Sequence, residues 1–101
     1  MIRRASLAVL CGLLVGAPVP ALAYTGQELA GAAKVSLDQA RAIALKAVPG
    51  EITDQELEKE DGGSGLRYSF DIMQGTKTFE VGIDAETGAV VENQPEGNNP
   101  D

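Results

Sequence analysis

Three carboxylates recur at every second position near the middle of the chain, at Glu56, Glu58 and Glu60. In an extended strand this spacing places them on one face, with neighbours about 6.6 Å apart. Such oxygens could hold a hard cation, and two carboxylates could act as acid and base, as in glycosidases. Calcium, however, needs about six to eight converging oxygens, whereas side chains on a strand point in parallel. The spacing therefore favours a solvated strand face, and we assign no metal ligand to it.

A second acidic run, from Asp84 through Glu86 to Gly88, imitates the first positions of a calcium-binding loop. Val90 and Val91 then stand where further ligands would be required. The run therefore predicts a hairpin turn, in which Gly88 can adopt the positive φ that closes the turn.

The residue types that most enzymatic chemistry needs are missing. The chain has no His and no Trp, and its one Cys is Cys11. A histidine base, a Ser-His-Asp triad and a Cys/His zinc site are therefore excluded. The chain is also too short to wall a substrate cleft around two carboxylates. We predict that the protein is not an enzyme and has no catalytic residue, no cofactor and no metal ligand.

The N-terminal segment has the form of a secretory signal peptide. Two arginines open it, an apolar stretch follows, and small residues stand at Ala21 and Ala23. A membrane anchor is the alternative, but the apolar stretch is shorter than the about 20 residues that span a bilayer. We predict cleavage between Ala23 and Tyr24, a periplasmic or secreted location, and no membrane contact once the signal peptide, residues 1–23, is removed.

The charge of the remaining chain limits its partners. Six Lys and Arg stand against 15 Asp and Glu, a formal charge of −9. So acidic a domain cannot release the phosphate counterions that drive nucleic-acid binding, and we expect no such partner. The same sign disfavours anionic lipid surfaces and favours a basic protein partner.

The pattern of apolar residues predicts an α+β fold with one N-terminal helix packed on an antiparallel sheet of three or four strands. Ser36 and Gln39 form a capping box, apolar residues then recur at helical spacing, and Pro49 stops the helix. After Gly50 the period changes from about 3.6 to 2. The expected strands cover residues 52–60, 66–73, 79–84 and 89–92, the first of them polar, as is typical of a sheet edge.

These elements divide the chain into four parts. After the signal peptide 1–23, residues 24–34 are small or polar and are expected to form a flexible leader. The ordered domain is expected over residues 35–93. Residues 94–101 are rich in Asn, Pro and Gly, which predicts a disordered tail.

Four segments in order carry a family resemblance. VSLDQA (35–40) opens the helix, ALKAVPG (44–50) closes it, and YSFDI (68–72) and FEVGIDAETG (79–88) follow as strands. This order resembles the PepSY domain over essentially the whole ordered unit. PepSY domains occur in propeptides of thermolysin-type secreted metallopeptidases, in spore-cortex proteins and as stand-alone exported proteins, and they are proposed to modulate peptidases. The family defines no catalytic residue. This sequence contains no protease domain, which argues against action in cis and leaves action in trans open.

Two surfaces are available to a partner, namely the sheet face away from the helix and the polar edge strand, which could accept a further strand. We expect the protein to bind and modulate another exported protein, with a peptidase as one candidate. The alternatives are an acidic protein that binds cations or small ligands in the envelope, and self-association as a homodimer. The residues on the two candidate surfaces are Glu56, Glu58, Glu60, Arg67, Ser69, Asp71, Met73 and Glu80.

Overall fold

Helix α1 (Leu37–Ala47) begins at the predicted capping box, in a computed structural model that describes residues 24–96. The Gln39 N–H donates to Ser36 Oγ at 3.1 Å, and the Ser36 N–H donates to Gln39 Oε1 at 2.9 Å. These two bonds satisfy backbone donors that the first turn of a helix leaves free. Val48 has an extended conformation, because the following Pro49 disfavours a helical one. The local sequence therefore sets both ends of the helix.

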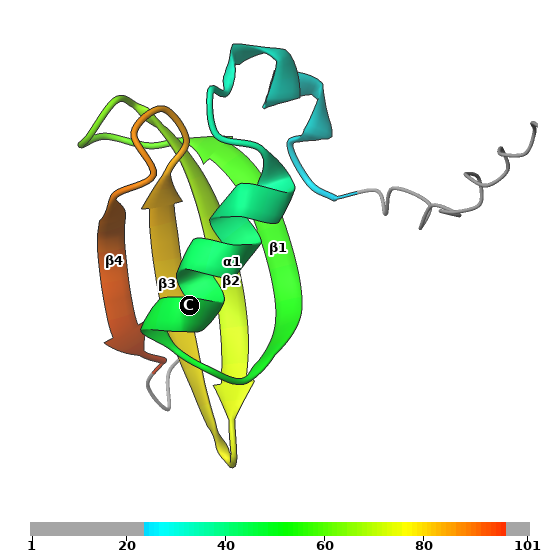
Figure 1. The fold of residues 1–101 in the computed structure, drawn as a ribbon, viewed down its shortest axis with the longest axis vertical. Helices are drawn as coiled ribbons and strands as arrows, with labels where there is room; N and C mark the ends of the chain where they lie inside the picture. The colour runs from blue at the N-terminus through cyan, green and yellow to red at the C-terminus, as the bar shows by residue number, and fades with distance from the viewer. Residues whose placement is uncertain (1–23, 97–101) are drawn as a thin grey trace, which may run out of the picture.

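Four strands follow the helix and form one sheet, and their bounds are β1 (Glu51–Lys59), β2 (Leu66–Gln74), β3 (Lys77–Asp84) and β4 (Val90–Pro95). Each strand pairs antiparallel with the next, in the order β1-β2-β3-β4 (Figure 1). The polar strand β1 lies at one edge, as predicted. The α+β fold is confirmed, and the sheet has four strands.

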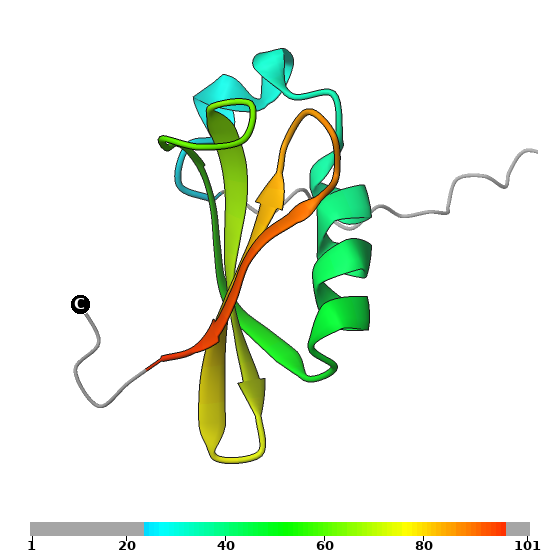
Figure 2. The ribbon, with the colours of Figure 1, turned by 90° about the vertical axis from the view of Figure 1, so that its left-hand side faces the viewer.

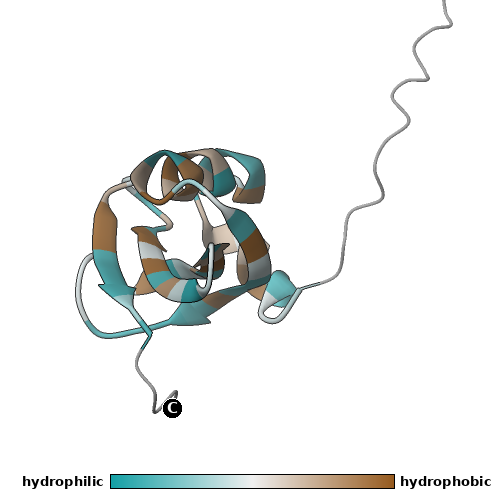
Figure 3. Ribbon diagram, turned by 90° about the horizontal axis from the view of Figure 1, so that it is seen from below, coloured by the Kyte–Doolittle hydropathy of each residue, from teal (hydrophilic) through white to brown (hydrophobic). Residues whose placement is uncertain are grey.

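Helix α1 packs on one face of the sheet, and the opposite face is left open by residues 24–96 (Figure 2). Alternation along the strands turns their large apolar side chains toward the helix, and brown, hydrophobic bands accordingly interleave with teal, hydrophilic ones along the ribbon (Figure 3). On the helix side, Ala40 and Ala44 are fully buried, and their small size lets the helix approach the sheet closely. The buried core consists of Ala40, Ala44, Val48, Leu57, Tyr68, Phe70, Ile72, Val81, Ile83 and Ala85.

Strand β4 extends beyond the end expected from the sequence. It runs to Pro95, so residues 94 and 95 belong to the sheet rather than to a disordered tail. Gln94 lies opposite Glu80, and the Glu96 N–H donates to the Thr78 carbonyl oxygen at 2.7 Å. This part of β4 is held by its pairing with β3 and its residues are exposed, so the strand end expected from the apolar pattern came too early. The rest of the expected tail, residues 97–101, lies outside the described residues.

The segment expected as a flexible leader follows a defined path. We call residues 24–33 the N-terminal strap; they include the 3₁₀-helix η2 (Gln27–Ala32). Thr25 forms a parallel bridge with Glu56 on the outer edge of β1, and the Leu57 N–H donates to the Thr25 carbonyl oxygen at 2.8 Å. Gly26 allows this approach, since its φ is 86° and a Cβ there would collide with the Leu57 carbonyl oxygen. Composition alone did not reveal this long-range contact.

The expected signal peptide and its cleavage site cannot be compared with the fold. The predicted signal peptide, with Ala21 and Ala23, lies outside the described residues. Tyr24 is the first described residue, and it packs against the core. No helix between residues 24 and 96 is long and apolar enough to cross a membrane.

Candidate functional site

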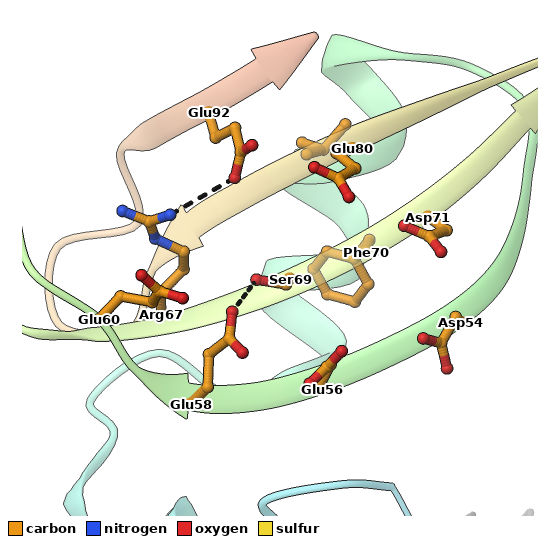
Figure 4. Close-up of a pocket in the computed structure, with 11 residues that line it drawn as sticks. Asp54, Glu56, Glu58, Glu60, Arg67, Ser69, Phe70, Asp71, Glu80 and Glu92 are labelled. Carbon is orange, nitrogen blue, oxygen red and sulfur yellow. Dashed lines mark hydrogen bonds and ion pairs between the residues drawn. The ribbon is translucent and has the colours of Figure 1, made fainter. Parts of the chain in front are cut away.

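A shallow groove of about 310 Å³ occupies the sheet face opposite α1 (Figure 4). Carboxylates of β1 stand along one side, those of β3 and β4 stand along the other, and β2 runs between them. Seven carboxylates and one guanidinium line it. We call this surface the acidic groove, and its lining residues are Asp54, Glu56, Glu58, Glu60, Arg67, Ser69, Phe70, Asp71, Glu80, Val81 and Glu92.

The groove is hollow because its centre carries small residues. Glu56, Ser69, Gly82 and Glu92 lie side by side on β1, β2, β3 and β4 in the strand register. Long acidic side chains thus stand at both ends of this row, and a hydroxymethyl group and a glycine lie between them. A Cβ at Gly82 would lie 3.0 Å from Arg67 Cδ, so the glycine also makes room for the arginine.

Arg67 neutralises only one end of the groove. Its Nη1 lies 3.4 Å from Glu92 Oε1, and the two side chains are 17% and 27% exposed. Beside it, the Ser69 hydroxyl donates to Glu58 Oε2 at 2.7 Å. Within residues 24–96 the one other ion pair, Lys34–Glu86, lies away from the groove lining. The carboxylates at the opposite end therefore have no cation of the described chain beside them.

Burial and this charge imbalance together raise the pKa values of three groove carboxylates. Burial, followed by the repulsion of Glu58 and Asp54, raises the pKa of Glu56. Burial raises the pKa of Asp71 and that of Glu80 in the same way, with further increases from neighbouring carboxylates. Each of these three carboxyl groups is harder to ionise than in water. A cation in the groove would therefore stabilise the ionised form of all three.

Three carboxylates converge most closely near the uncompensated end. Asp71, Glu80 and Glu96 each offer an oxygen within 4.8 Å of the other two. All three side chains are partly exposed, and three oxygens are fewer than the about six to eight that calcium takes. The cluster therefore has the charge but not the enclosure of a dedicated metal site.

The two surfaces predicted separately from the sequence form one surface in the structure. Strand register brings the acidic edge strand and the open sheet face together, because Glu56 lies opposite Ser69 and Glu58 lies opposite Arg67. Met73 is the exception, since it is 40% exposed but does not line the groove. The predicted surface residues that do line it are Glu56, Glu58, Glu60, Arg67, Ser69, Asp71 and Glu80.

The candidate surface expected from the sequence left out two acidic lining residues, Asp54 and Glu92, and the nearby Glu96. Asp54 precedes the run of three glutamates at the same two-residue spacing, so alternation could have identified it. Glu92 and Glu96 lie in and just after β4, whose extent was underestimated. Only the register of β4 against β3 shows that these two side chains approach Glu80.

Asp84 has a structural role at the end of β3. It is 3% exposed and accepts backbone N–H bonds from Ser64 at 2.7 Å, Glu86 at 2.8 Å and Thr87 at 3.0 Å. These bonds hold the pKa of its carboxyl well below the usual range, despite burial. The run from Asp84 to Gly88 is thus the predicted turn, with φ 82° at Gly88. Its buried carboxylate joins two loops and is occupied by the protein's own amides.

Comparison with known proteins gives one match. A sequence model of the PepSY family, described as "Peptidase propeptide and YPEB domain", matches residues 34–93 of the 101-residue chain. The match covers α1, β1, β2 and β3 and most of β4, and with them the strands that form the acidic groove. No curated protein and no solved structure matches the chain.

Proposed function

Because this chain belongs to the PepSY family, we propose that it is an exported, non-catalytic binding module that docks on another exported protein and modulates it. A peptidase is the first candidate partner, since the family is described by peptidase propeptides. Docking of the module covers part of the partner's surface.

One observation carries the mode of binding, namely the open acidic groove. A sheet normally needs cover on one face only, and here α1 supplies that cover. On the other face seven carboxylates share one arginine, an arrangement that costs stability and attracts cations. Such a face steers a basic partner toward it and raises the rate of association.

The residue types of the chain support a role without catalysis. It has no His, and its one Cys precedes Tyr24. Outside the groove, the carboxyl group with a strongly lowered pKa is that of Asp84. It is buried and accepts bonds from three backbone N–H groups. Regulation by steric cover requires none of the missing groups.

The test of this function uses the full chain, expressed with its own N-terminus and recovered in the form that the cell makes. Peptidases exported by the same cells are assayed against a protein substrate with and without it. We expect slower turnover that is restored at high salt. The Glu56→Gln, Glu58→Gln, Glu60→Gln variant should modulate more weakly, whereas unchanged peptidase activity with the unmodified protein would refute peptidase modulation.

Export is tested on the same preparation. Mass spectrometry of the protein from the envelope or the medium should give a chain that begins at Tyr24. A chain that retains Ala21 and Ala23 and stays with the cell would contradict export by signal cleavage.

Cation binding is the second candidate, and the convergence of Asp71, Glu80 and Glu96 is the observation that favours it. A bound ion stabilises the folded state by RT ln(1 + [L]/Kd), so a specific site raises the melting temperature at micromolar calcium. A solvated acidic face responds only to total ionic strength, equally with calcium and with a matched concentration of magnesium.

A further inference from the structure

We propose that the acidic groove binds an extended, basic segment of the partner by seating one lysine or arginine side chain at its uncompensated end. This inference rests on the proposed function and names the chemistry of the partner. We call the carboxylates at this place the open end; they are Asp54, Asp71, Glu80 and Glu96.

The asymmetry of the groove is the first argument. Arg67 and Asp71 are four residues apart on β2, which separates them by about 13 Å along the strand. At the Arg67 end, a guanidinium already lies beside Glu92 at 3.4 Å. At the Asp71 end, Asp54 and Glu80 are its two neighbours in the register, and all three side chains are acidic. A cation from a partner would neutralise carboxylates at the open end, as Arg67 does at the other end.

The shape of the groove is the second argument. Between its two ends lie Ser69 and Gly82, and the acidic side chains of β1 and of β3 and β4 rise on either side (Figure 4). A cavity of about 310 Å³ accepts a few side chains and not a folded surface. An extended segment delivers such side chains at alternate positions, at the same spacing as the strand beneath it.

The sheet edges are the third argument, because each is protected against an added strand. Thr25 and the N-terminal strap occupy part of the β1 edge. The β4 edge carries Pro95, which has no N–H to donate, and an irregularity next to Ile83. A peptide is therefore expected on the face of the sheet rather than beside it.

Charge complementarity selects the occupant among extended segments. An acidic or neutral segment would bring no positive charge to the carboxylates of Asp71 and Glu80, whose pKa values are raised by burial and by their acidic neighbours. A second copy of this chain brings the same negative charge and is repelled. Nucleic acid is repelled for the same reason.

The test uses defined peptides and the full chain. The probe is an acetylated and amidated peptide of alternating arginine and serine, and its neutral match has citrulline in place of each arginine. Binding is followed by NMR at the backbone amides of Ser69 and Gly82, at low and at physiological salt. We expect the arginine peptide to shift these two amides and the citrulline peptide to leave them unchanged.

Two matched double variants separate the groove from general charge. Asp71→Asn with Glu80→Gln removes two carboxylates from the open end, and Glu28→Gln with Glu86→Gln removes two exposed carboxylates that do not line the groove. The first should weaken peptide binding about tenfold, and the second less than about twofold. Equal losses in both variants would overturn the inference, since binding would then follow net charge alone.

A third variant tests the shape without changing the charge. Ser69→Leu fills the centre of the groove and should weaken binding several-fold; unchanged binding would show that no side chain is seated there.

Three further outcomes bear on the inference. If calcium shifts the NMR signals of the Ser69 and Gly82 amides and the arginine peptide does not compete with it, the inference is overturned. If the peptide fails to bind while the protein still slows a peptidase, only this inference fails. If the peptide binds and no exported protein is affected, the inference stands and peptidase modulation fails.

Discussion

Asp84 and two carboxylates of the acidic groove, Glu56 and Glu80, are all partly or wholly withdrawn from water, yet their pKa values move in opposite directions. Three backbone N–H groups converge on Asp84 and lower the pKa of its carboxyl. The carboxylates of Glu56 and Glu80 face other carboxylates, and their pKa values are raised. Burial alone would raise all of them, so the donors that the fold supplies decide the sign.

The two kinds of carboxylate differ in what they do for this small domain. Asp84 connects the glycine-rich loop before β2 to the turn after β3, and its charge stabilises the fold. The groove carboxylates contribute repulsion that the fold tolerates. Proteins commonly retain such destabilising arrangements where they bind ligands.

Removal of the Asp84 carboxylate gives the largest expected effect. Asp84→Ala leaves three backbone N–H groups without their acceptor, so we expect a loss of about 3 kcal/mol in the free energy of unfolding. Urea denaturation at neutral pH measures it. The control is Asp61→Ala, at an exposed residue of the glycine-rich loop to which Asp84 is bonded, and it should change stability by less than about 0.5 kcal/mol. Similar small losses in both variants would remove the distinction between the two kinds of carboxylate.

Acidification tests the same contrast from the Asp84 side. A carboxyl whose pKa is lowered by folding stabilises the protein above its unfolded pKa of about 3.9, and this contribution is lost as the pH falls below that value. The stability of the unmodified protein should therefore fall steeply below about pH 4. Asp84→Asn should show a shallower fall, because its side chain has no proton to gain. Parallel pH profiles would contradict the role assigned to Asp84.

The groove predicts the opposite slope at higher pH. A carboxyl whose pKa is raised by folding binds its proton more tightly in the folded state, so stability declines as the pH rises from the unfolded pKa through the folded pKa. We expect a decline above about pH 4.3, the usual pKa of a glutamate, until the groove carboxyls are ionised. Thermal melts between pH 4 and 7 should show it, and it should weaken in the Glu56→Gln, Glu80→Gln variant. A flat profile in the unmodified protein would contradict the repulsion.

Neutralising groove carboxylates at constant pH gives the smallest effect, with a sign opposite to that at Asp84. Glu56→Gln with Glu80→Gln should stabilise the protein by about 0.5 kcal/mol at neutral pH and low salt, the size typical of partly exposed charge interactions. In about 1 M salt the gain should vanish, because the screening length falls to about 3 Å. A loss of stability in low salt would mean that these side chains are held by favourable contacts.

Much of the fold was predictable because its determinants are local. Ser36 and Gln39 lie three residues apart, and the alternation along β2 and β3 needs no knowledge of the partner strand. The end of β4 and the path of the strap were not predictable, because they depend on contacts between residues far apart in the sequence, Glu96 with Thr78 and Thr25 with Glu56.

The candidate site also has parts that were predictable from local sequence and parts that depend on long-range contacts. Two-residue spacing predicted that Glu56 and Glu58 share a face, but the register brings β4 and its Glu92 to that face. The turn from Asp84 to Gly88 was predicted from its residue types. The bond from Ser64, twenty residues earlier in the chain, depends on the finished sheet.

The N-terminal strap has a consequence for the order of folding. Its bridge joins Thr25 to Glu56, a contact that requires β1 to be in place, and no residue of η2 is fully buried. Contacts that close a long loop form late, after the hairpins with shorter loops. In the export that we propose, which starts from the N-terminus, the strap would therefore leave the translocation channel before the sheet that receives it exists. The first described residues to reach the new compartment are expected to be the last to become protected against hydrogen exchange.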